Sequence, residues 1–188
     1  VYQRVTRTYT LAILPITNAT QDPNQDYLSQ ALTRNLYDKF SYLPRFDVRM
    51  PSVRPNKDEK LDFLGVGRDL RADAVLTGEL VVRDGTLQLH VRLLETSNGS
   101  QTWEQNFAAD STSLLILQDE IAKEVTSKLG LWLIGDDRAL LAKRQTNNPE
   151  ALNYYMQGNR LLSLKRDREN IRKAIDYFER ATDLDPSF

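Results

Sequence analysis

The chain contains no cysteine and a single histidine, His90. The absence of cysteine excludes disulfides, thiolate metal ligands and cysteine nucleophiles, but it leaves the cellular compartment open. A zinc centre needs a set of histidine, cysteine and carboxylate ligands that one histidine cannot provide. The composition therefore predicts neither a metal site nor a thiol enzyme.

An excess of either charge and a long apolar run are also missing. The 188 residues include 25 basic and 26 acidic side chains, for a net charge of −1. Nucleic-acid binding needs a concentrated positive face, so we expect no nucleic-acid partner. No segment is apolar enough to span a membrane, and 40% hydrophobic residues suffice for a proper core. Because the chain begins with Val1 and shows no signal peptide, we expect a piece of a larger protein.

Glycines are few, and they are absent where a phosphate loop would need them. The polar stretch Thr17–Asp26 has none, so its backbone cannot closely approach a phosphate. The sole G-x-G is Gly65-Val66-Gly67, and Leu70 occupies the place of the third glycine of a dinucleotide fingerprint. This segment leaves a helix, so we interpret the glycines as a helix C-cap.

Asp22, Asn24 and Asp26 alternate as they do at the start of a calcium loop. Such a loop requires glycine at its sixth position and a bidentate glutamate at its twelfth. Tyr27 and Thr33 stand there instead. The stretch is therefore predicted to turn the chain, with Asp22 capping the following helix.

Catalytic patterns are equally incomplete. His90 lies between Gln88 and Arg92 on the polar side of an alternating run, so we expect a solvated surface residue, without the G-x-S-x-G of a hydrolase. Neighbouring carboxylates such as Asp119-Glu120 and Asp136-Asp137 diverge from each other and are interpreted as solvated charge. Kinase motifs are absent. We predict no catalytic residue, no cofactor and no metal.

The first half of the chain alternates between strand and helix patterns. A strand is predicted over Thr8–Ile16 and a second one around Phe46–Met50, ahead of Pro51. The helix between them ends near Leu43-Pro44. Its apolar stripe consists of Tyr27, Leu28, Ala31, Leu32, Leu36 and Phe40. A further helix is predicted over Lys57–Leu70, with Leu61, Leu64 and Leu70 facing inward.

Three extended runs then form the clearest pattern in the sequence. They cover Asp73–Arg83, Thr86–Thr96 and Gln101–Ala108, and Asp84-Gly85 and Asn98-Gly99 separate them. These dipeptides favour tight hairpins because both residues reach positive φ. In the middle run Leu87, Leu89, Val91 and Leu93 share one face. An antiparallel meander with a polar opposite face is predicted.

A third helix completes the first domain. Asp110–Ser113 is predicted to cap it, and its stripe consists of Leu114, Leu117, Ile121, Val125 and Leu129. The order β-α-β-α-β-β-β-α predicts an α/β domain over residues 1–133, with helices on one side of a mixed sheet of about five strands. Trp103 and Trp132 are assigned to either the core or an interface. Residues 134–147 are predicted to be a linker.

Residues 148–188 follow a helix–turn–helix pattern. Pro149 suits the first turn of a helix, a charged turn covers Lys165–Glu169, and Asp185-Pro186 ends the second helix. A single helical hairpin cannot bury its apolar face alone. We therefore predict an interaction set of four residues, namely Tyr155, Leu162, Phe178 and Leu184.

The segments "NPEALNYYMQGNRLL" and "AIDYFERATDLDPSF" resemble a tetratricopeptide (TPR) repeat. Gly158 stands where the first helix needs a small residue, and Ala174, Phe178, Ala181 and Pro186 match the second-helix spacing. The distance from Gly158 to Ala174 exceeds that of a repeat of about 34 residues. The resemblance thus implies the first hairpin of a truncated array, with an insertion in its turn.

Residues from about Thr10 to Leu133 resemble the TolB amino-terminal-like domain. The matching blocks are "LAILPITNATQDPNQDYLSQALTRNL", "DLRADAVLTGELVVRDGTLQLHVRLLETSNGSQTWEQNF" and "LQDEIAKEV". This resemblance implies no catalytic residues. It implies a bacterial signalling protein whose serine/threonine kinase, adenylate cyclase or DNA-binding domain lies elsewhere, often beyond a membrane anchor.

The leading hypothesis is a non-catalytic sensory and protein-interaction region, with a protein or peptide partner and further TPR repeats in the parent chain. We expect this region not to insert into a membrane itself, and its membrane-anchored parent is compatible with an extracytoplasmic location. The alternative is a small-ligand receptor that regulates the attached kinase or cyclase, with a pocket between the sheet and Thr17–Gln25. A hydrolase or transferase that uses His90 is the third class.

Overall fold

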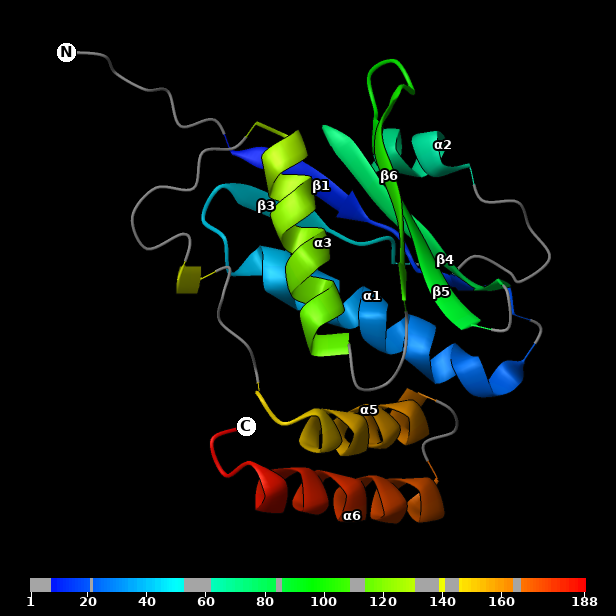
Figure 1. Cartoon of the computed structure of the whole chain (residues 1–188), viewed down its shortest axis with the longest axis vertical. Helices are drawn as coiled ribbons and strands as arrows, with labels where there is room; N and C mark the ends of the chain where they lie inside the picture. Colours follow the sequence, from blue (N-terminus) through cyan, green and yellow to red (C-terminus); the bar gives the residue numbers. More distant parts are fainter. Residues whose placement is uncertain are drawn as a thin grey trace.

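The computed structural model describes residues 8–20, 22–52, 62–83, 86–108, 114–130, 139–140, 146–163 and 167–188. Within them lie six strands and five α-helices in a mixed α/β arrangement (Figure 1). In chain order these are β1 (Tyr9–Ile13), β2 (Thr17–Asn18), the 3₁₀ turn η1 (Pro23–Gln25), α1 (Asp26–Ser41), β3 (Phe46–Arg49), α2 (Phe63–Asp69), β4 (Ala74–Arg83), β5 (Thr86–Glu95), β6 (Gln101–Ala108), α3 (Leu114–Lys128), α5 (Pro149–Ser163) and α6 (Arg168–Leu184). The predicted order of the first domain is confirmed, with the short strand β2 added.

The strands form one mixed sheet in the order β3-β1-β4-β5-β6, and β2 pairs with β4 beside this path. Strand β1 is parallel to both β3 and β4, whereas β5 is antiparallel to both β4 and β6. The connections between the strands account for this difference. Parallel neighbours need a long crossover such as a helix, whereas antiparallel neighbours need only a turn.

The main core lies between one face of the sheet and the helices α1 and α3. Leu11 and Ile13 of β1 point to this face and are at most 1% exposed, and Leu89 of β5 is fully buried. The predicted stripe of α3 is confirmed at Leu117, Ile121 and Val125, while the side chain of Leu114 and the predicted cap Asp110–Ser113 lie outside the described residues. Trp103 belongs to this core, and Trp132 also lies outside the described residues.

The opposite face of the sheet carries a second, smaller core under α2. Ala12, Leu14 and Val75 are buried there, together with apolar side chains of α2. The prediction that the helices cover one side of the sheet is therefore wrong. Central parallel strands are apolar on both faces, so each face needs a covering helix. Arg92 of β5 adds to this contact, because its guanidinium lies 5.3 Å from the centre of the Phe63 ring.

The glycines of α2 serve packing rather than termination. Both lie within Phe63–Asp69, and a Cβ on Gly67 would lie 2.5 Å from Cγ2 of Val75. The left-handed residue after the helix is Arg71, with φ of 51°. The predicted glycine C-cap is thus wrong, since close approach of α2 to β4 requires Gly67. The predicted first turn, Lys57–Leu61, lies outside the described residues.

The predicted meander is confirmed, with strand ends within one residue of those expected. Asp84-Gly85 lies outside the described residues. The other connection differs from the prediction, because Thr96–Ser100 separates β5 from β6 and only Gly99 has positive φ, at 73°. A longer loop needs one left-handed residue, whereas a two-residue hairpin needs two.

Helix α1 starts later than expected. It begins at Asp26 after the N-cap residue Gln25, and no side chain caps it. Asp22 instead accepts the backbone N–H of Gln25 on its carbonyl oxygen, which closes η1. The predicted capping role of Asp22 is therefore wrong.

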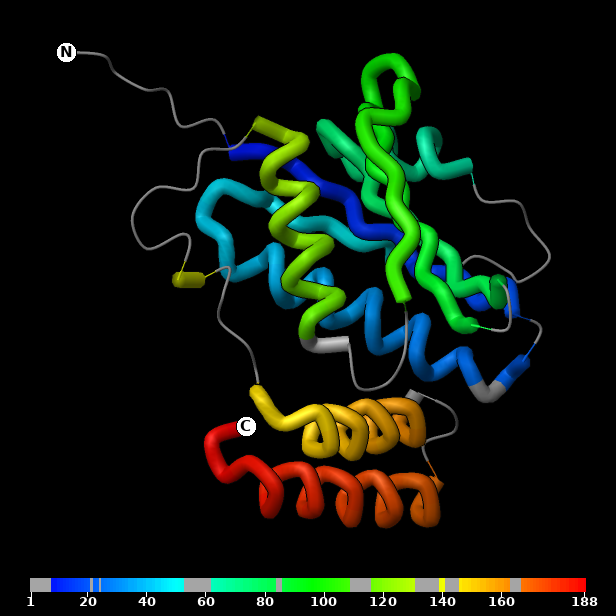
Figure 2. The backbone as a smooth tube through the Cα atoms, viewed as in Figure 1, coloured from blue at the N-terminus to red at the C-terminus, as the bar shows by residue number. Residues whose placement is uncertain are grey.

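Helices α5 and α6 form a hairpin that lies beside α1 (Figure 2). Leu152 and Met156 of α5 are at most 4% exposed and belong to the main core. Arg160 places its guanidinium 5.5 Å from the Tyr27 ring centre of α1. Helix α5 thus joins the hairpin to the α/β part, whereas α6 packs on α5.

Candidate functional site

The structure brings part of the predicted interaction set together. The Tyr155 ring lies 5.7 Å from Phe178 and 4.9 Å from Phe188 between centroids. Tyr155, Leu162 and Phe178 are half-buried. Leu184 is 39% exposed and, six residues beyond Phe178, projects from a different side of α6. Two members of the set, Tyr155 and Phe178, therefore form an aromatic cluster with Phe188, and Leu184 is set apart from it.

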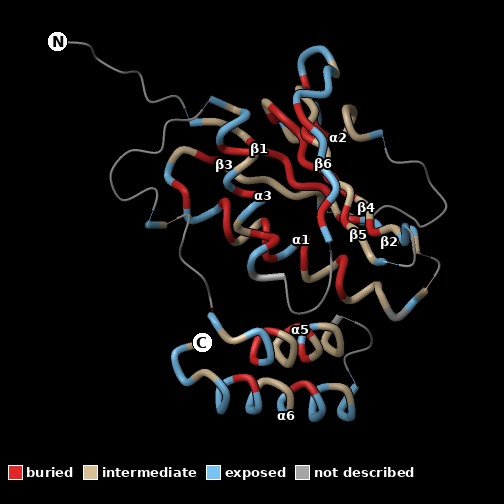
Figure 3. The backbone as a smooth tube through the Cα atoms, in the orientation of Figure 1, coloured by how far each residue is buried: buried red, intermediate tan, exposed pale blue. Residues whose placement is uncertain are grey.

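Helix α6 buries small residues and exposes large apolar ones. Its buried residues are Ala174 and Ala181, whereas Ile171 is 41% and Ile175 49% exposed. Figure 3 shows that much of α6 is coloured as exposed. Ile171, Ile175 and Phe178 follow at intervals of four and three residues, so they form one stripe along α6. We name these three residues the α6 stripe. Sequence reasoning missed its two isoleucines, although their helical spacing could have identified them.

A small side chain sets the distance between the two helices of the hairpin. A Cβ added to Gly158 would lie 2.5 Å from Cε1 of Phe178. The Phe178 ring therefore occupies the space above Gly158, and α5 and α6 approach closely there. On another side of the pair, the rings of Tyr154 and Tyr177 stack at 6.0 Å.

Hydrogen bonds close the open end of the hairpin. Thr146 donates its hydroxyl to Oδ2 of Asp185, and Ser187 donates its own to Oδ1 at 2.6 Å. Asn148 donates from Nδ2 to the carbonyl oxygen of Leu184 at 3.2 Å. The bonds from Ser187 and Thr146 stabilise the carboxylate and lower the pKa of Asp185 below its ordinary value.

The single histidine lies between two carboxylates on the polar face of the sheet. Nδ1 of His90 is 3.4 Å from Oε1 of Glu79, and Nε2 is 3.3 Å from Oε2 of Glu104. The histidine side chain is 16% exposed, so the prediction of a solvated residue is wrong. Among the residues that the structure describes, no group of three or more histidine, cysteine, aspartate or glutamate side chains is arranged to hold a metal ion.

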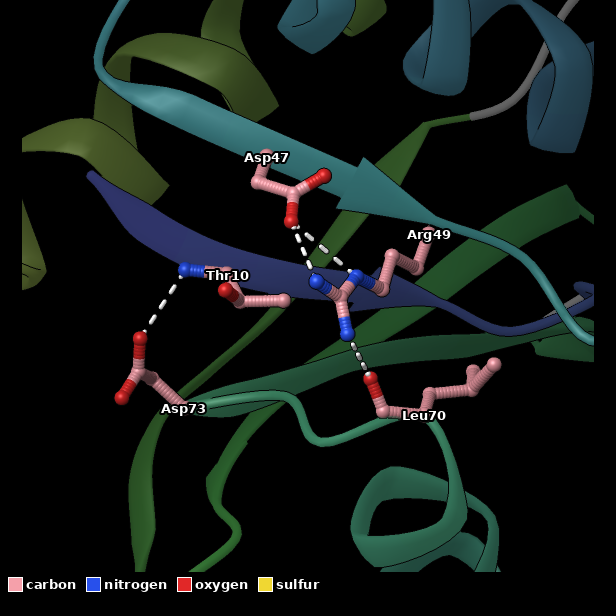
Figure 4. Close-up of polar contacts among 5 residues, drawn as sticks. All are labelled: Thr10, Asp47, Arg49, Leu70 and Asp73. Atoms are coloured by element: carbon pink, nitrogen blue, oxygen red, sulfur yellow. Dashed lines mark hydrogen bonds and ion pairs between the residues drawn. The ribbon is translucent and has the colours of Figure 1, made fainter.

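A second polar cluster holds the opposite edge of the sheet together (Figure 4). Arg49 of β3 donates from Nη2 to Oδ2 of Asp47 at 2.5 Å and from Nη1 to the carbonyl oxygen of Leu70 at 2.6 Å. Oδ2 of Asp73 accepts the backbone N–H of Thr10 at 2.9 Å. These bonds join β3, β1 and the segment between α2 and β4, so their role is structural.

The loop that imitates a calcium site is held by an asparagine. Asn18 donates from Nδ2 to the carbonyl oxygen of Asp22 at 2.8 Å and to Oδ1 of Asp26 at 2.7 Å. Its Oδ1 accepts the Thr20 hydroxyl at 2.6 Å. The polar side chains of this loop therefore bond to one another. The sequence pattern drew attention to the aspartates, whereas Asn18 organises the loop.

One carboxylate that is predicted to be solvated belongs to a partly buried ion pair. Asp119 of α3 accepts from Nζ of Lys39 at 2.6 Å, and the Lys39 side chain is only 4% exposed. Glu120 is exposed, as predicted, and Asp136-Asp137 lies outside the described residues. The prediction for Asp119 is wrong because its partner is 80 residues away in the sequence.

No helix in the described part of the chain is both long and apolar enough to cross a membrane. A curated protein of Rhizobium meliloti (strain 1021), named "Putative adenylate cyclase 3", is 20% identical over 177 residues. That alignment covers 94% of this chain and 30% of the relative, so the chain spans less than a third of the relative's length.

The chain is also similar to two solved structures. PelC of Paraburkholderia phytofirmans, a dodecamer, is 20% identical, with 66% of this chain and 88% of that chain covered and a TM-score of 0.42. TolB of Acinetobacter baumannii is 12% identical, with 69% of this chain and 30% of that chain covered and a TM-score of 0.42.

A family profile described as "HilA/YgeH-like transcriptional regulator, second domain" matches residues 7–124. The matched segment contains the whole sheet with α1 and α2 and most of α3, and it ends before α5 and α6. Because it includes more than half of the 188 residues, the chain belongs to the family of second domains of HilA/YgeH-like transcriptional regulators.

Proposed function

We propose that this chain is the non-catalytic sensory and protein-interaction region of a larger bacterial signalling protein. In this proposal residues 1–133 form an α/β domain, residues 134–147 connect it to the hairpin, and residues 148–188 form the first unit of a TPR-type array. The observation that carries the proposal is the α6 stripe, in which Phe178 packs against α5 while Ile171 and Ile175 are 41% and 49% exposed.

The hairpin has the packing that a helical repeat needs. Gly158 admits the Phe178 ring, and Ala174 and Ala181 are at most 1% exposed. Small residues at these contacts let two antiparallel helices approach closely. In repeat proteins each unit buries its remaining apolar surface against the next unit. We assign that role to Ile171 and Ile175 of the α6 stripe, with the following helix of the parent as their cover.

The comparisons support a larger parent with a separate output. The family name denotes the second domain of transcriptional regulators, and the curated relative is named as an adenylate cyclase and is much longer than this chain. We propose that the parent carries such an output module, either a cyclase, a DNA-binding domain or a serine/threonine kinase. A membrane anchor and an extracytoplasmic location for this region remain part of the proposal.

The stacking test compares two lengths of the same protein. One is the present 188-residue chain, and the other is a natural chain that continues through at least two further helices. Ile175→Glu is made in both, and Arg172→Glu serves as the control because Arg172 is exposed on α6 but lies outside the stripe. Thermal unfolding and hydrogen exchange of α6 are measured for each.

We expect Ile175→Glu to lower the melting temperature of the longer chain only, because burying an unpaired carboxylate is costly while an exposed one is tolerated. Hydrogen exchange of α6 should also be slower in the longer wild type. Equal effects in the two lengths, or equal effects of the two substitutions, would refute the stacking role.

Partner binding is tested separately with the longer chain. We expect a purified protein or peptide ligand to bind the wild type and to lose affinity when residues of the interaction set are changed. An array that binds neither proteins nor peptides would refute the interaction role. For the small-ligand alternative no contact in the described loop gives specific support, because Thr20 and Asp26 both bond to Asn18.

A further inference from the structure

The two edges of the sheet differ in how they are protected. Strand β3 has four residues, among them Asp47 and Arg49, and Pro51 follows soon after it. Short length, charge and a nearby proline are the devices by which proteins block edge pairing. Strand β6, at the other edge, is eight residues long and contains neither lysine nor proline. Glu104 is its single charged residue.

Strand β6 is free along its outer side in the described part of the chain. It pairs with β5 alone and ends the strand order of the sheet. Gln105 and Asn106 are exposed, as are Gln101, Thr102, Glu104 and Ala108. The one irregularity in its pairing lies at its start, opposite Leu93 and Leu94, so the rest of the strand is regular. Such an edge has backbone N–H and C=O groups ready to pair with another strand.

The sequence of β6 is complementary to itself when two copies run antiparallel about Gln105. In that register Glu104 faces Asn106 of the second copy, at both symmetric positions, and no two glutamates face each other. Trp103 then faces Phe107 on the side of the sheet that carries the main core, where both rings already lie. An axis at Glu104 would instead place two carboxylates directly opposite each other, which is unfavourable.

We propose that β6 is a self-association surface, at which two copies of this chain join antiparallel across a two-fold axis at Gln105 and continue the sheet. The occupant is a second copy because in this register no two glutamates face each other and each Trp103 faces a Phe107. The contact is a single pair of eight-residue strands, so it falls at the small, weak end of specific interfaces. We expect a dimer that forms at roughly 10 µM to 1 mM.

The test uses two opposite changes at one exposed residue of the whole chain. Asn106→Lys places an ammonium opposite Glu104 of the second copy, whereas Asn106→Glu places a carboxylate there, each change occurring twice in the dimer. Val82→Lys and Val82→Glu are the controls, because Val82 is 56% exposed but lies on the interior strand β4. Sedimentation equilibrium gives the dissociation constant, and circular dichroism verifies that each variant is folded.

We expect Asn106→Lys to tighten the dimer and Asn106→Glu to weaken it, each on the order of tenfold for two cross-strand pairs. Both Val82 variants should leave the constant unchanged. A wild type that stays monomeric up to about 1 mM would overturn the proposal. The dissociation constant of the dimer could change in the same direction for both Asn106 variants, or change for neither of them. Either result would overturn the register and with it the assigned surface. If Asn106→Glu is unfolded, the tightening by Asn106→Lys decides alone.

Discussion

The α/β body and helix α6 use apolar side chains in opposite ways. In the body the large residues are inside, and Phe40, Leu36 and Leu89 are at most 1% exposed. In α6 the buried residues are alanines, and the isoleucines lie on the surface. Helix α5 connects the two regions, because its Leu152 and Met156 lie in the main core of the body.

This difference separates side chains that stabilise the fold from side chains that stay exposed on the surface. Burial of large apolar side chains supplies most of the free energy that stabilises a folded domain. The body already buries such side chains against one another within the described residues. Two alanines supply little, and α6 is held mainly through α5. A helix with this distribution gains stability when another surface covers its isoleucines. Four predictions follow from the contrast, in decreasing order of expected effect.

The largest contrast is between a core ring and an exposed isoleucine. Phe40→Ala removes a fully buried ring that lies 5.2 Å from the ring centre of Phe46, so we expect a loss of about 3–5 kcal/mol in unfolding free energy. Ile175→Ala should change it by less than about 0.5 kcal/mol in the same chain. Urea denaturation of both variants measures these values. Similar losses would remove the distinction between body and α6.

Ion pairs of the body and of α6 should differ in their contribution to stability in the same way. Asp119→Ala leaves the ammonium of Lys39 buried without its carboxylate partner on α3, which we expect to cost about 3 kcal/mol. Lys39→Met with Asp119→Ala should recover most of this loss, because no buried charge remains. On α6 the pair Lys173–Glu169 is mostly exposed, and Lys173→Ala should leave the melting temperature unchanged. A large effect of Lys173→Ala would contradict the comparison.

Close packing within the hairpin should have an intermediate effect. Gly158→Ala brings a Cβ into the Phe178 ring, and overpacking of about 1–3 kcal/mol is partly offset by about 1 kcal/mol of better helix propensity. We therefore expect faster hydrogen exchange in α5 and α6, with the exchange of β4 and β5 unchanged. Phe178→Leu in the same chain should restore slow exchange. Uniformly faster exchange throughout the chain would show that hairpin and body unfold together.

The smallest effect concerns pH. Hydrogen bonds from Ser187 and Thr146 lower the pKa of Asp185 below 3.8 in the folded chain. A lowered folded pKa means that the contribution to stability is fully present above 3.8 and is lost as pH falls through the folded value. We expect hydrogen exchange near α6 to accelerate in that window in the wild type but not in Asp185→Asn. A carboxyl titration of Asp185 by NMR at or above 3.8 would disprove the assignment.

Local patterns in the sequence predicted the elements well. The alternation from Leu87 to Leu93 identified β5 and the face that enters the core, because a strand places successive side chains on opposite sides. The stripe Leu117, Ile121 and Val125 identified α3 for the corresponding reason at helical spacing. These patterns depend on backbone geometry alone, so a single sequence is enough to detect them.

Several of the errors concern relations between distant segments. Nothing near Asp119 in the sequence reveals Lys39, and nothing near Gly67 reveals the methyl group of Val75 that it must accommodate. The same limit applies to the interaction set, since Tyr155 and Phe178 were named for the helical pattern and their contact comes from the hairpin. The spacing of Ile171 and Ile175 identifies a helical stripe, but only the structure shows that these two residues are exposed.

Composition and periodicity by themselves determined that this chain lacks cysteine chemistry, that it alternates between helices and strands, and that it ends in a helical hairpin. Those properties follow from residue types and from the two backbone periods. The tertiary structure alone decided that α2 covers the far face of the sheet, that Lys39 is buried beside Asp119, and that β6 is the last strand of the sheet among the described residues. Each of these depends on which surfaces meet in space, and a one-dimensional pattern does not contain that information.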